Sequence, residues 1–420
     1  MAKNALQKEL AKRIDGYRDE MIELQKKLSA IQALSPASGG EGEGKKADFL
    51  IEYLKGMKFS SIERLDAPDP ACPGGRPNVI ARFKGKDSSR TIWVMSHLDV
   101  VPPGDPKLWT GDPWTVRPGK DAAGRDTLIG RGVEDNQQGV VSGIFAAKAL
   151  MELPTVPAHD VALIFVADEE TGSRWGIQWV LQEHAGLFRK EDLIIVPDAG
   201  DAHGTMIEVA EKSICWVKFE VKGKQVHASM PEKGVNAHLA ASHLIVKLHK
   251  RLKAQFKEKD KVFDPPISTF EPTKKDANVP NINTIPGEDI FYFDCRVLPT
   301  RTLDEVITAV REECDAVEKD RGVKVTFDYP QKEQAAPATP VDAPVVLALQ
   351  RAVKDVYNKK ARPMGIGGGT VAAVFRRAGF NAAVWATMDE AAHQPDEYCV
   401  IDNMLGDAKV FAHVFTQESA

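Results

Sequence analysis

The sequence has no long apolar run. No stretch of its 420 residues approaches the ~20 consecutive apolar residues that a membrane-spanning helix needs. Residues 1–21 carry a charge every few positions and lack the apolar core of a signal peptide. Lys and Arg are scattered and the formal net charge is only -5, so we expect no nucleic-acid partner and no membrane partner. These absences predict a cytoplasmic protein.

Cysteine is scarce as well. The cysteines are odd in number, widely spaced and without a C-x-x-C pair: Cys72, Cys215, Cys295, Cys314 and Cys399. This pattern excludes a disulfide framework and a zinc knuckle. We expect free thiols in a reducing compartment.

The length and composition are those of an ordinary globular protein. Apolar residues make up 43% and charged residues 27%, which excludes a disordered or fibrous chain. A chain of 420 residues exceeds one ordinary core, so we expect two domains, or one large domain with an insertion.

The N-terminal segment has helical periodicity. Apolar residues from Leu6 to Ile31 recur at alternating steps of four and three, which predicts one long amphipathic helix. This periodicity fits both a helix packed on a globular domain and a coiled coil. The apolar stripe is short for a coiled coil, which favours the packed helix. The segment SPASGGEGEG then breaks the pattern, and helical periodicity resumes over 46–57.

Strands and helices then alternate along the chain. The apolar patterns predict strands at 78–83, 91–96, 161–167 and 194–196, and helices at 139–150 and 175–184. Such alternation is typical of an α/β domain whose functional groups lie on loops at strand ends.

The character of the sequence changes near Ile214. A half-exposed strand is predicted at 215–221, followed by helix 237–256, strand 290–298, helix 303–321 and strand 323–329. This order predicts a compact α+β insertion. A linker then leads back to the first domain at the helix 344–357. We therefore expect a discontinuous domain, 1–212 and 330–420, with an inserted domain at 213–329.

Histidine and carboxylate residues follow the predicted strands or lie in Gly-rich loops. They are His97, Asp99, Asp135, Glu169, Glu170, Asp198 and His393. Singly, each has an ordinary explanation as a turn or helix-capping residue. Together, acidic groups at the ends of buried strands repel one another unless a cation compensates. Two His and three carboxylates, one of them bridging, would give each of two metals three protein ligands and room for a water.

The order of these motifs, H-x-D, GRG-x-x-D, EE, P-D and a C-terminal His, resembles the M20 family of metallopeptidases and aminoacylases over about residues 49–415. That family includes acetylornithine deacetylase, succinyl-diaminopimelate desuccinylase and carnosinase-type dipeptidases. The resemblance implies a zinc-peptidase-like α/β catalytic domain with an inserted, ferredoxin-like α+β lid or dimerisation domain. It also implies two Zn²⁺ per chain, with Co²⁺ or Mn²⁺ as substitutes.

The resemblance assigns roles to the clustered residues. His97 and Asp198 would hold one zinc, Glu170 and His393 the other, and Asp135 would bridge both. Asp99 would orient the imidazole of His97. Glu169 is similar to the family's general base, which takes a proton from the metal-bridging water and passes it to the leaving amine.

Position 198 departs from part of the family. The deacetylase and desuccinylase members usually carry Glu there, whereas Asp is common in the dipeptidase and aminopeptidase members. The ligand set stays intact, and Asp198 favours the peptidases slightly.

The inserted domain carries further residues that match the family. The segment KGKQVHASMPEKGVNA resembles the one whose His, here His227, reaches across a homodimer into the partner's site and stabilises the oxyanion. Asn283 and Arg296 would bind the substrate carboxylate or the transition state. A hydrogen-bonded turn for His227 and a structural salt bridge for Arg296 are the alternatives.

The segment GIGGGT, 365–370, resembles the family's G-G-T loop. There the backbone of Gly368 and Gly369 and the hydroxyl of Thr370 would hold the substrate carboxylate. A plain helix-entry turn is the alternative.

The sequence as a whole favours a dinuclear zinc hydrolase of a small substrate with a free carboxylate. A dipeptide and an N-acyl amino acid are both open as substrates, since fold analogy does not fix chemistry within a superfamily. A non-catalytic binding protein on the same fold is disfavoured because no ligand and no base is missing.

Overall fold

The computed structural model describes residues 3–154 and 156–418, and the chain divides into two compact units. The first unit comprises Met1–Val209, Thr339–Pro363 and Thr370–Ala420. The second unit comprises Ala210–Ala338 and Met364–Gly369, so the insertion predicted at 213–329 falls inside it. No helix among the described residues has both the length and the apolar character needed to cross a bilayer.

The first unit is built on a large mixed sheet. Its strands run in the order β1-β2-β6-β3-β7-β16-β8-β15. Their bounds are β1 Ser61–Ala67, β2 Arg76–Phe83, β3 Asp87–His97, β6 His159–Val166, β7 Leu193–Asp201, β8 Met206–Glu211, β15 Arg362–Ile366 and β16 Ala382–Thr387. β3 is parallel to both of its neighbours, β6 and β7, and β16 is parallel to β7.

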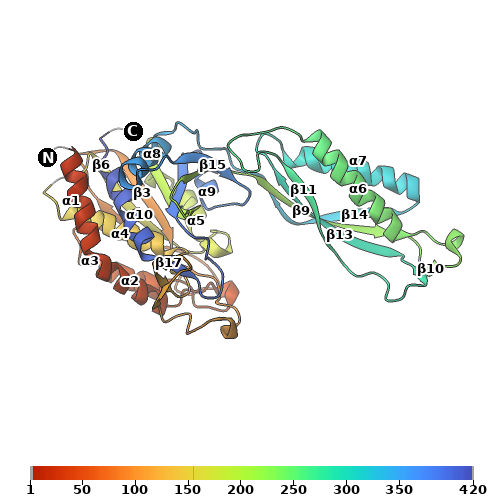
Figure 1. Ribbon diagram of the computed structural model, residues 1–420, viewed down its shortest axis with the longest axis horizontal. Helices are drawn as coiled ribbons and strands as arrows, with labels where there is room; N and C mark the ends of the chain where they lie inside the picture. Colours follow the sequence, from red (N-terminus) through yellow and green to blue (C-terminus); the bar gives the residue numbers. More distant parts are fainter. Residues whose placement is uncertain (1–2, 155, 419–420) are drawn as a thin grey trace. The chain divides into compact units, whose positions relative to one another are not determined.

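Helices cover both faces of the central strands. The helices of this unit are α1 Lys3–Gly16, α2 Arg18–Ala30, α3 Gly44–Lys55, α4 Gln137–Met151, α5 Ile177–Glu183, α8 Pro344–Tyr357, α9 Ala372–Arg377 and α10 Ile401–Phe415 (Figure 1). Ile164 and its even-numbered neighbours pack with Val180 of α5 and Phe375 of α9. Leu163 points to the other face, towards Gly143 of α4. Because both faces are covered, these strands are apolar throughout, as the sequence predicted.

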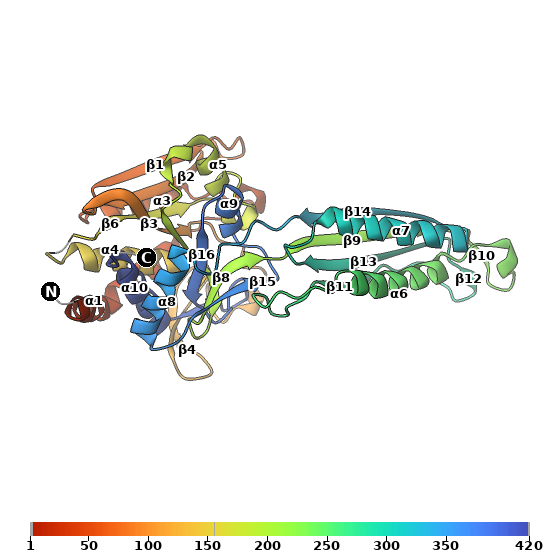
Figure 2. The same ribbon diagram turned by 90° about the horizontal axis from the view of Figure 1, so that it is seen from above.

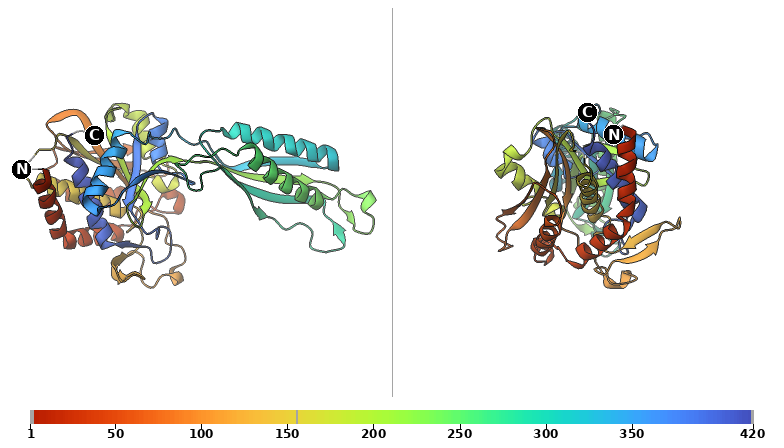
Figure 3. Two further views of the ribbon diagram at one scale, coloured as in Figure 1. Left: turned by 45° about the horizontal axis from the view of Figure 1, so that its top comes forward. Right: turned by 90° about the vertical axis from the view of Figure 1, so that its left-hand side faces the viewer.

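The N-terminal helix predicted as a single element is in fact two. The chain breaks at Gly16–Tyr17 between α1 and α2. Glycine is a poor helix former, which makes this the favourable point for a break. Both helices pack on α4 and α10 (Figure 3), so the packed-helix interpretation is confirmed.

The second unit has one four-stranded antiparallel sheet and two helices. The strands of this sheet and the two helices are β9 Ser213–Lys222, α6 Ala237–Gln255, β11 Thr269–Lys275, β13 Glu288–Val297, α7 Leu303–Arg321 and β14 Lys324–Glu333. The strand order β11-β13-β9-β14, visible in Figure 2, and the chain order βαββαβ together make a ferredoxin-like fold. The α/β fold class with a ferredoxin-like α+β insertion is confirmed.

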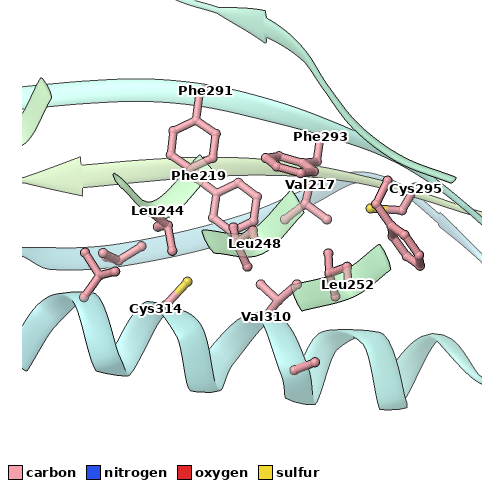
Figure 4. Packing of buried hydrophobic residues seen from close by; sticks show 14 of the residues in the cluster. Val217, Phe219, Leu244, Leu248, Leu252, Phe291, Phe293, Cys295, Val310 and Cys314 are labelled. Carbon is pink, nitrogen blue, oxygen red and sulfur yellow. The ribbon is translucent and has the colours of Figure 1, made fainter. Parts of the chain in front are cut away.

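Buried and more exposed residues alternate along the strands, so the core of the second unit lies on one face of its sheet. Phe219 of β9 stacks on Phe291 of β13, with ring centroids 4.7 Å apart. Leu248 of α6 and Val310 of α7 belong to the same buried cluster (Figure 4). The Thr302 hydroxyl and the Glu305 carboxylate form a capping box that begins α7. All five cysteines are buried and free, as predicted.

Candidate metal centre

The predicted ligands meet at the carboxyl ends of the central parallel strands of the large sheet. His97 is the last residue of β3, Glu169 and Glu170 follow β6 in the short 3-10 helix Glu169–Thr171, and Asp198 lies in β7. Since β6 and β7 both run parallel to β3, the carboxyl ends of the three strands lie next to one another. Asp135 comes from the loop before α4, and His393 from the loop between β16 and β17 (Tyr398–Val400).

Asp135 lies between two imidazoles. Its Oδ1 is 2.8 Å from Nε2 of His97, and its Oδ2 is 3.0 Å from Nε2 of His393. Nε2 of His97 is also 3.3 Å from Oδ1 of Asp198, and Nε2 of His393 is 3.1 Å from Oε2 of Glu170. The predicted residues thus form two ligand groups that share Asp135, and within each group the ligand atoms lie within 4.8 Å of one another.

These groups fit divalent cations. Imidazole nitrogens and carboxylate oxygens are ligands that zinc accepts, and each group offers three. Oε1 of Glu170 is buried and has no hydrogen-bond partner among the described residues. A buried carboxylate oxygen without a partner is costly, and a cation would satisfy it.

Without a cation the cluster perturbs its own ionisation. Burial and then the charge of Asp198 raise the pKa of Glu169 well above its ordinary value. Hydrogen bonds to Asp135 and Glu170 raise the pKa of His393 to about 10. Burial alone would raise the pKa of Asp135, but hydrogen bonds from His393 and His97 outweigh it and lower that pKa. The carboxylates therefore depend on positive charge, which protons supply here and metal ions would supply otherwise.

Asp99 contacts both the histidine and the Glu-Glu segment. Nδ1 of His97 is 3.0 Å from the backbone oxygen of Asp99 and 3.5 Å from its Oδ1. The Asp99 carboxylate accepts hydrogen bonds from the backbone N–H groups of Glu169 and Glu170, each at 3.0 Å. The sequence predicted the contact with His97 but not the second one.

A buried ionic network lies beside the Glu-Glu segment. The guanidinium of Arg76 donates to Glu43 at 2.7 Å and to Asp69 at 3.2 Å, and lies 3.3 Å from Asp168. Asp168 has a left-handed backbone (φ 63°) and donates its N–H to Glu43 at 3.2 Å. The network fixes the residue before Glu169. Sequence reasoning missed it, because Arg76 and its partners form no local pattern.

The predicted site residues His227, Asn283, Arg296, Gly368 and Gly369 lie in the second unit. His227 is exposed, and its Nδ1 is 2.8 Å from the hydroxyl of Ser229. The two-residue strands β10 (Val226–His227) and β12 (Thr284–Ile285) pair, and Asn283 accepts a hydrogen bond from the N–H of Ala228. His227 and Asn283 are therefore neighbours.

Arg296 lies beside the Gly-rich loop. Its guanidinium pairs with Asp294 through two hydrogen bonds and donates a third, from Nη1, to the backbone oxygen of Gly367 at 2.9 Å. The salt bridge considered as the alternative for Arg296 is therefore present, and Arg296 lies next to Gly368 and Gly369. Thr370 belongs to the first unit, where its hydroxyl lies 3.4 Å from Oε2 of Glu208.

Comparison with known proteins identifies the family. Residues 93–417 match the model of peptidase family M20/M25/M40. The chain belongs to this family. It is an M20 family metallohydrolase, and divalent metal ions, usually zinc, are implied by that membership.

Similar proteins include an uncharacterized metallohydrolase of Methanocaldococcus jannaschii, which is 37% identical over 94% of this chain and 98% of its own length. Succinyl-diaminopimelate desuccinylase of Paracoccus denitrificans is 28% identical over 93% of this chain and 96% of its own. Among solved structures, aminopeptidase PepT from Bacillus cereus superposes with a TM-score of 0.73 at 18% identity, covering 95% of this chain and 98% of that one.

Proposed function

We propose that this M20 enzyme is a dinuclear zinc hydrolase that cleaves the amide or peptide bond of a small substrate with a free carboxylate. The observation that carries the proposal is the position of Asp135, whose two oxygens face His97 and His393 separately. Two cations, each held by one imidazole and two carboxylates, would share this residue. Co²⁺ or Mn²⁺ could take the same ligand atoms.

Glu169 is the residue to which we assign proton transfer. Bound zinc would polarise the substrate carbonyl and lower the pKa of a coordinated water towards ~7. Glu169 would accept the proton of the attacking water and donate it to the leaving nitrogen. The hydrogen bond from its backbone N–H to Asp99 fixes the segment that carries it.

We assign recognition of the substrate carboxylate to Arg296, Gly368, Gly369, Thr370 and Asn283. A guanidinium suits a carboxylate because it offers paired donors in one plane. The hydrogen bond from Arg296 to Gly367 supports placing these residues in one binding site, because it holds the Arg296 guanidinium beside the backbone of the Gly-rich loop.

We assign oxyanion stabilisation to His227, acting from the partner in a homodimer. Its Nδ1 contacts the Ser229 hydroxyl, and its Nε2 forms no hydrogen bond or ion pair in the described part of the chain. An exposed imidazole held by one nitrogen can donate from the other to a developing oxyanion. We place the enzyme in the cytoplasm, because five buried free thiols suit a reducing compartment.

Two substrate classes compete. Asp198 favours a peptidase, with dipeptides as the first substrates to test. The similarity to a succinyl-diaminopimelate desuccinylase favours an N-acyl amino acid instead. The chemistry at the metal centre is the same in both cases.

The test is metal analysis followed by a substrate screen. We expect about two zinc or cobalt ions per chain. A chelator should abolish activity, and added metal should restore it. Dipeptides, N-acetyl amino acids and N-succinyl amino acids would be assayed in parallel. A metal-loaded protein that turns over none of these classes would be a binding protein, and the proposal would fail.

A further inference from the structure

Two buried carboxylates outside the ligand set lie in the loops that carry Asp135 and His393. Glu134 directly precedes Asp135, and Glu397 follows His393 by four residues. Their exposed fractions are 2% and 1%. A buried carboxylate is costly unless hydrogen bonds or a cation satisfy it, so the contacts of these two residues are informative.

Glu397 holds the loop of Asp135. Its carboxylate accepts hydrogen bonds from three backbone N–H groups of that loop, those of Gly132 at 3.0 Å, Glu134 at 2.9 Å and Asp135 at 3.1 Å. It also pairs with Arg131 at 2.6 Å. Gly132 has φ +82°, and a Cβ there would lie 2.6 Å from Val100, so only glycine fits this turn.

Glu134 holds the loop of His393 in return. Its Oε1 accepts a hydrogen bond from the N–H of Asp389 at 2.8 Å, and its Oε2 from the N–H of Ala391 at 2.5 Å. Each ligand loop is therefore fastened by a carboxylate of the other. Unlike Glu397, Glu134 has no ion pair with Lys or Arg in the described ranges.

His393 depends on such anchors because packing does not hold it. Its side chain is 54% exposed and its backbone is left-handed, with φ 63°. Its loop is also held at its two ends by ion pairs of Arg125 with Asp389 and of Arg117 with Asp396. The Glu134 carboxylate ties the part of this loop that leads into His393, at Asp389 and Ala391, to the residue next to Asp135.

We propose that Glu134 is a positioning residue for the metal site formed by Asp135, Glu170 and His393. The inference rests on the proposed dinuclear centre. Both backbone hydrogen bonds of Glu134 set the approach of His393 to Asp135, so losing one loosens this site. The site formed by His97, Asp135 and Asp198 should be less affected, because His97 and Asp198 are held by the strands β3 and β7.

The test separates the two sites with ligand variants. Glu134→Gln keeps size and shape but leaves one acceptor oxygen, and its amide N–H would face a backbone N–H. It would be introduced into Asp198→Ala, where only the Asp135, Glu170 and His393 site is complete. It would also be introduced into His393→Ala, where only the other site is complete.

We expect Glu134→Gln to weaken Zn²⁺ binding about 10- to 100-fold in the Asp198→Ala background. In the His393→Ala background the change should stay within about threefold, well below the effect of a supporting group. Binding would be measured by titrating the metal-free proteins with Zn²⁺ against a chromophoric chelator. Equal weakening in both backgrounds, or none in either, overturns the proposal.

Arg125→Gln provides a second route should Glu134→Gln fail to fold. It removes the ion pair of Arg125 with Asp389 in the His393 loop without changing a metal ligand, and it should weaken the same site selectively. Glu183→Gln, an exposed change on α5, is the matched control and should alter neither site. A wild-type protein that binds fewer than two ions would refute the dinuclear centre itself, which is a different outcome from equal affinities in the variants.

Discussion

The carboxylate of Asp99 accepts a hydrogen bond from the backbone N–H of Glu169 at 3.0 Å. The same carboxylate lies 3.5 Å from Nδ1 of His97, so one side chain links the histidine of one strand end to the proposed base at the next. This link defines what a substitution at Asp99 should do.

Asp99→Asn should lower kcat about 10- to 100-fold, as loss of a supporting group at a metal site usually does. The amide keeps one acceptor oxygen but turns its N–H₂ towards a backbone N–H of Glu169 or Glu170. Steady-state kinetics and metal analysis together check this. Unchanged kcat with two bound ions would show that neither contact of Asp99 matters to turnover.

Variants at Asp135 and at His393 should retain different numbers of metal ions. Asp135→Ala removes a ligand from both groups and should leave neither site occupied, whereas His393→Ala should leave one ion per chain. Elemental analysis after dialysis is the measurement. Equal loss in the two variants would contradict a shared Asp135.

Glu169→Gln should lower kcat about 10²- to 10⁴-fold, the range for loss of a general base. Metal content should stay at the wild-type value, because Glu169 is in neither ligand group. The control is Glu183→Gln, whose kcat should match the wild type. Wild-type turnover by Glu169→Gln on every substrate would remove the assignment.

Asp407 should make stability depend on pH. It is buried in α10 and accepts hydrogen bonds from Gln138, Thr387 and Tyr357. Burial raises the pKa of Asp407 to about 7. A folded-state pKa above the unfolded value means that the folded protein binds the proton more tightly, so stability falls as the pH rises from about 4 to about 7.

Asp407→Asn should remove this slope, since the amide does not titrate. Between pH 5 and pH 8 the wild type should lose roughly 2–3 kcal/mol of unfolding free energy relative to the variant. Thermal unfolding midpoints of the two metal-free proteins at both pH values give the comparison. Parallel pH profiles would mean that Asp407 is ionised in the folded protein.

Phe219→Ala should destabilise the second unit by about 3–5 kcal/mol, because it empties the centre of a buried aromatic cluster. Lys218→Ala on the opposite face of β9 should change stability by only about 0.5 kcal/mol. Thermal unfolding followed by circular dichroism measures both. Similar midpoints for the two variants would contradict the packing described for this core.

The sequence predicted the central elements and the ligand cluster for a physical reason. Apolar runs such as 161–167 are unmistakable when a strand is buried on both faces, and the polar residue after each run marks a strand end. Parallel strands place such ends together, so His97, Glu170 and Asp198 could be grouped before their distances were known.

Other features left no local trace. The strand Ala382–Thr387 is short and alanine-rich, so its periodicity does not separate strand from helix. The partners of Arg76 and Glu134 come from distant segments, and a buried ion pair looks like any two charges in a sequence. The assignment of residues 364–369 to the second unit also depends on contacts that no motif encodes.

The register of β9 against β14 has a practical consequence. Ile214 at the start of β9 lies directly across from Glu333 at the end of β14. Antiparallel neighbours of this kind are about 5 Å apart at their Cα atoms, a span that a tight turn closes. The segment between these two residues can therefore be replaced by a few residues, giving a shortened variant that keeps all five proposed metal ligands but lacks His227, Asn283 and Arg296.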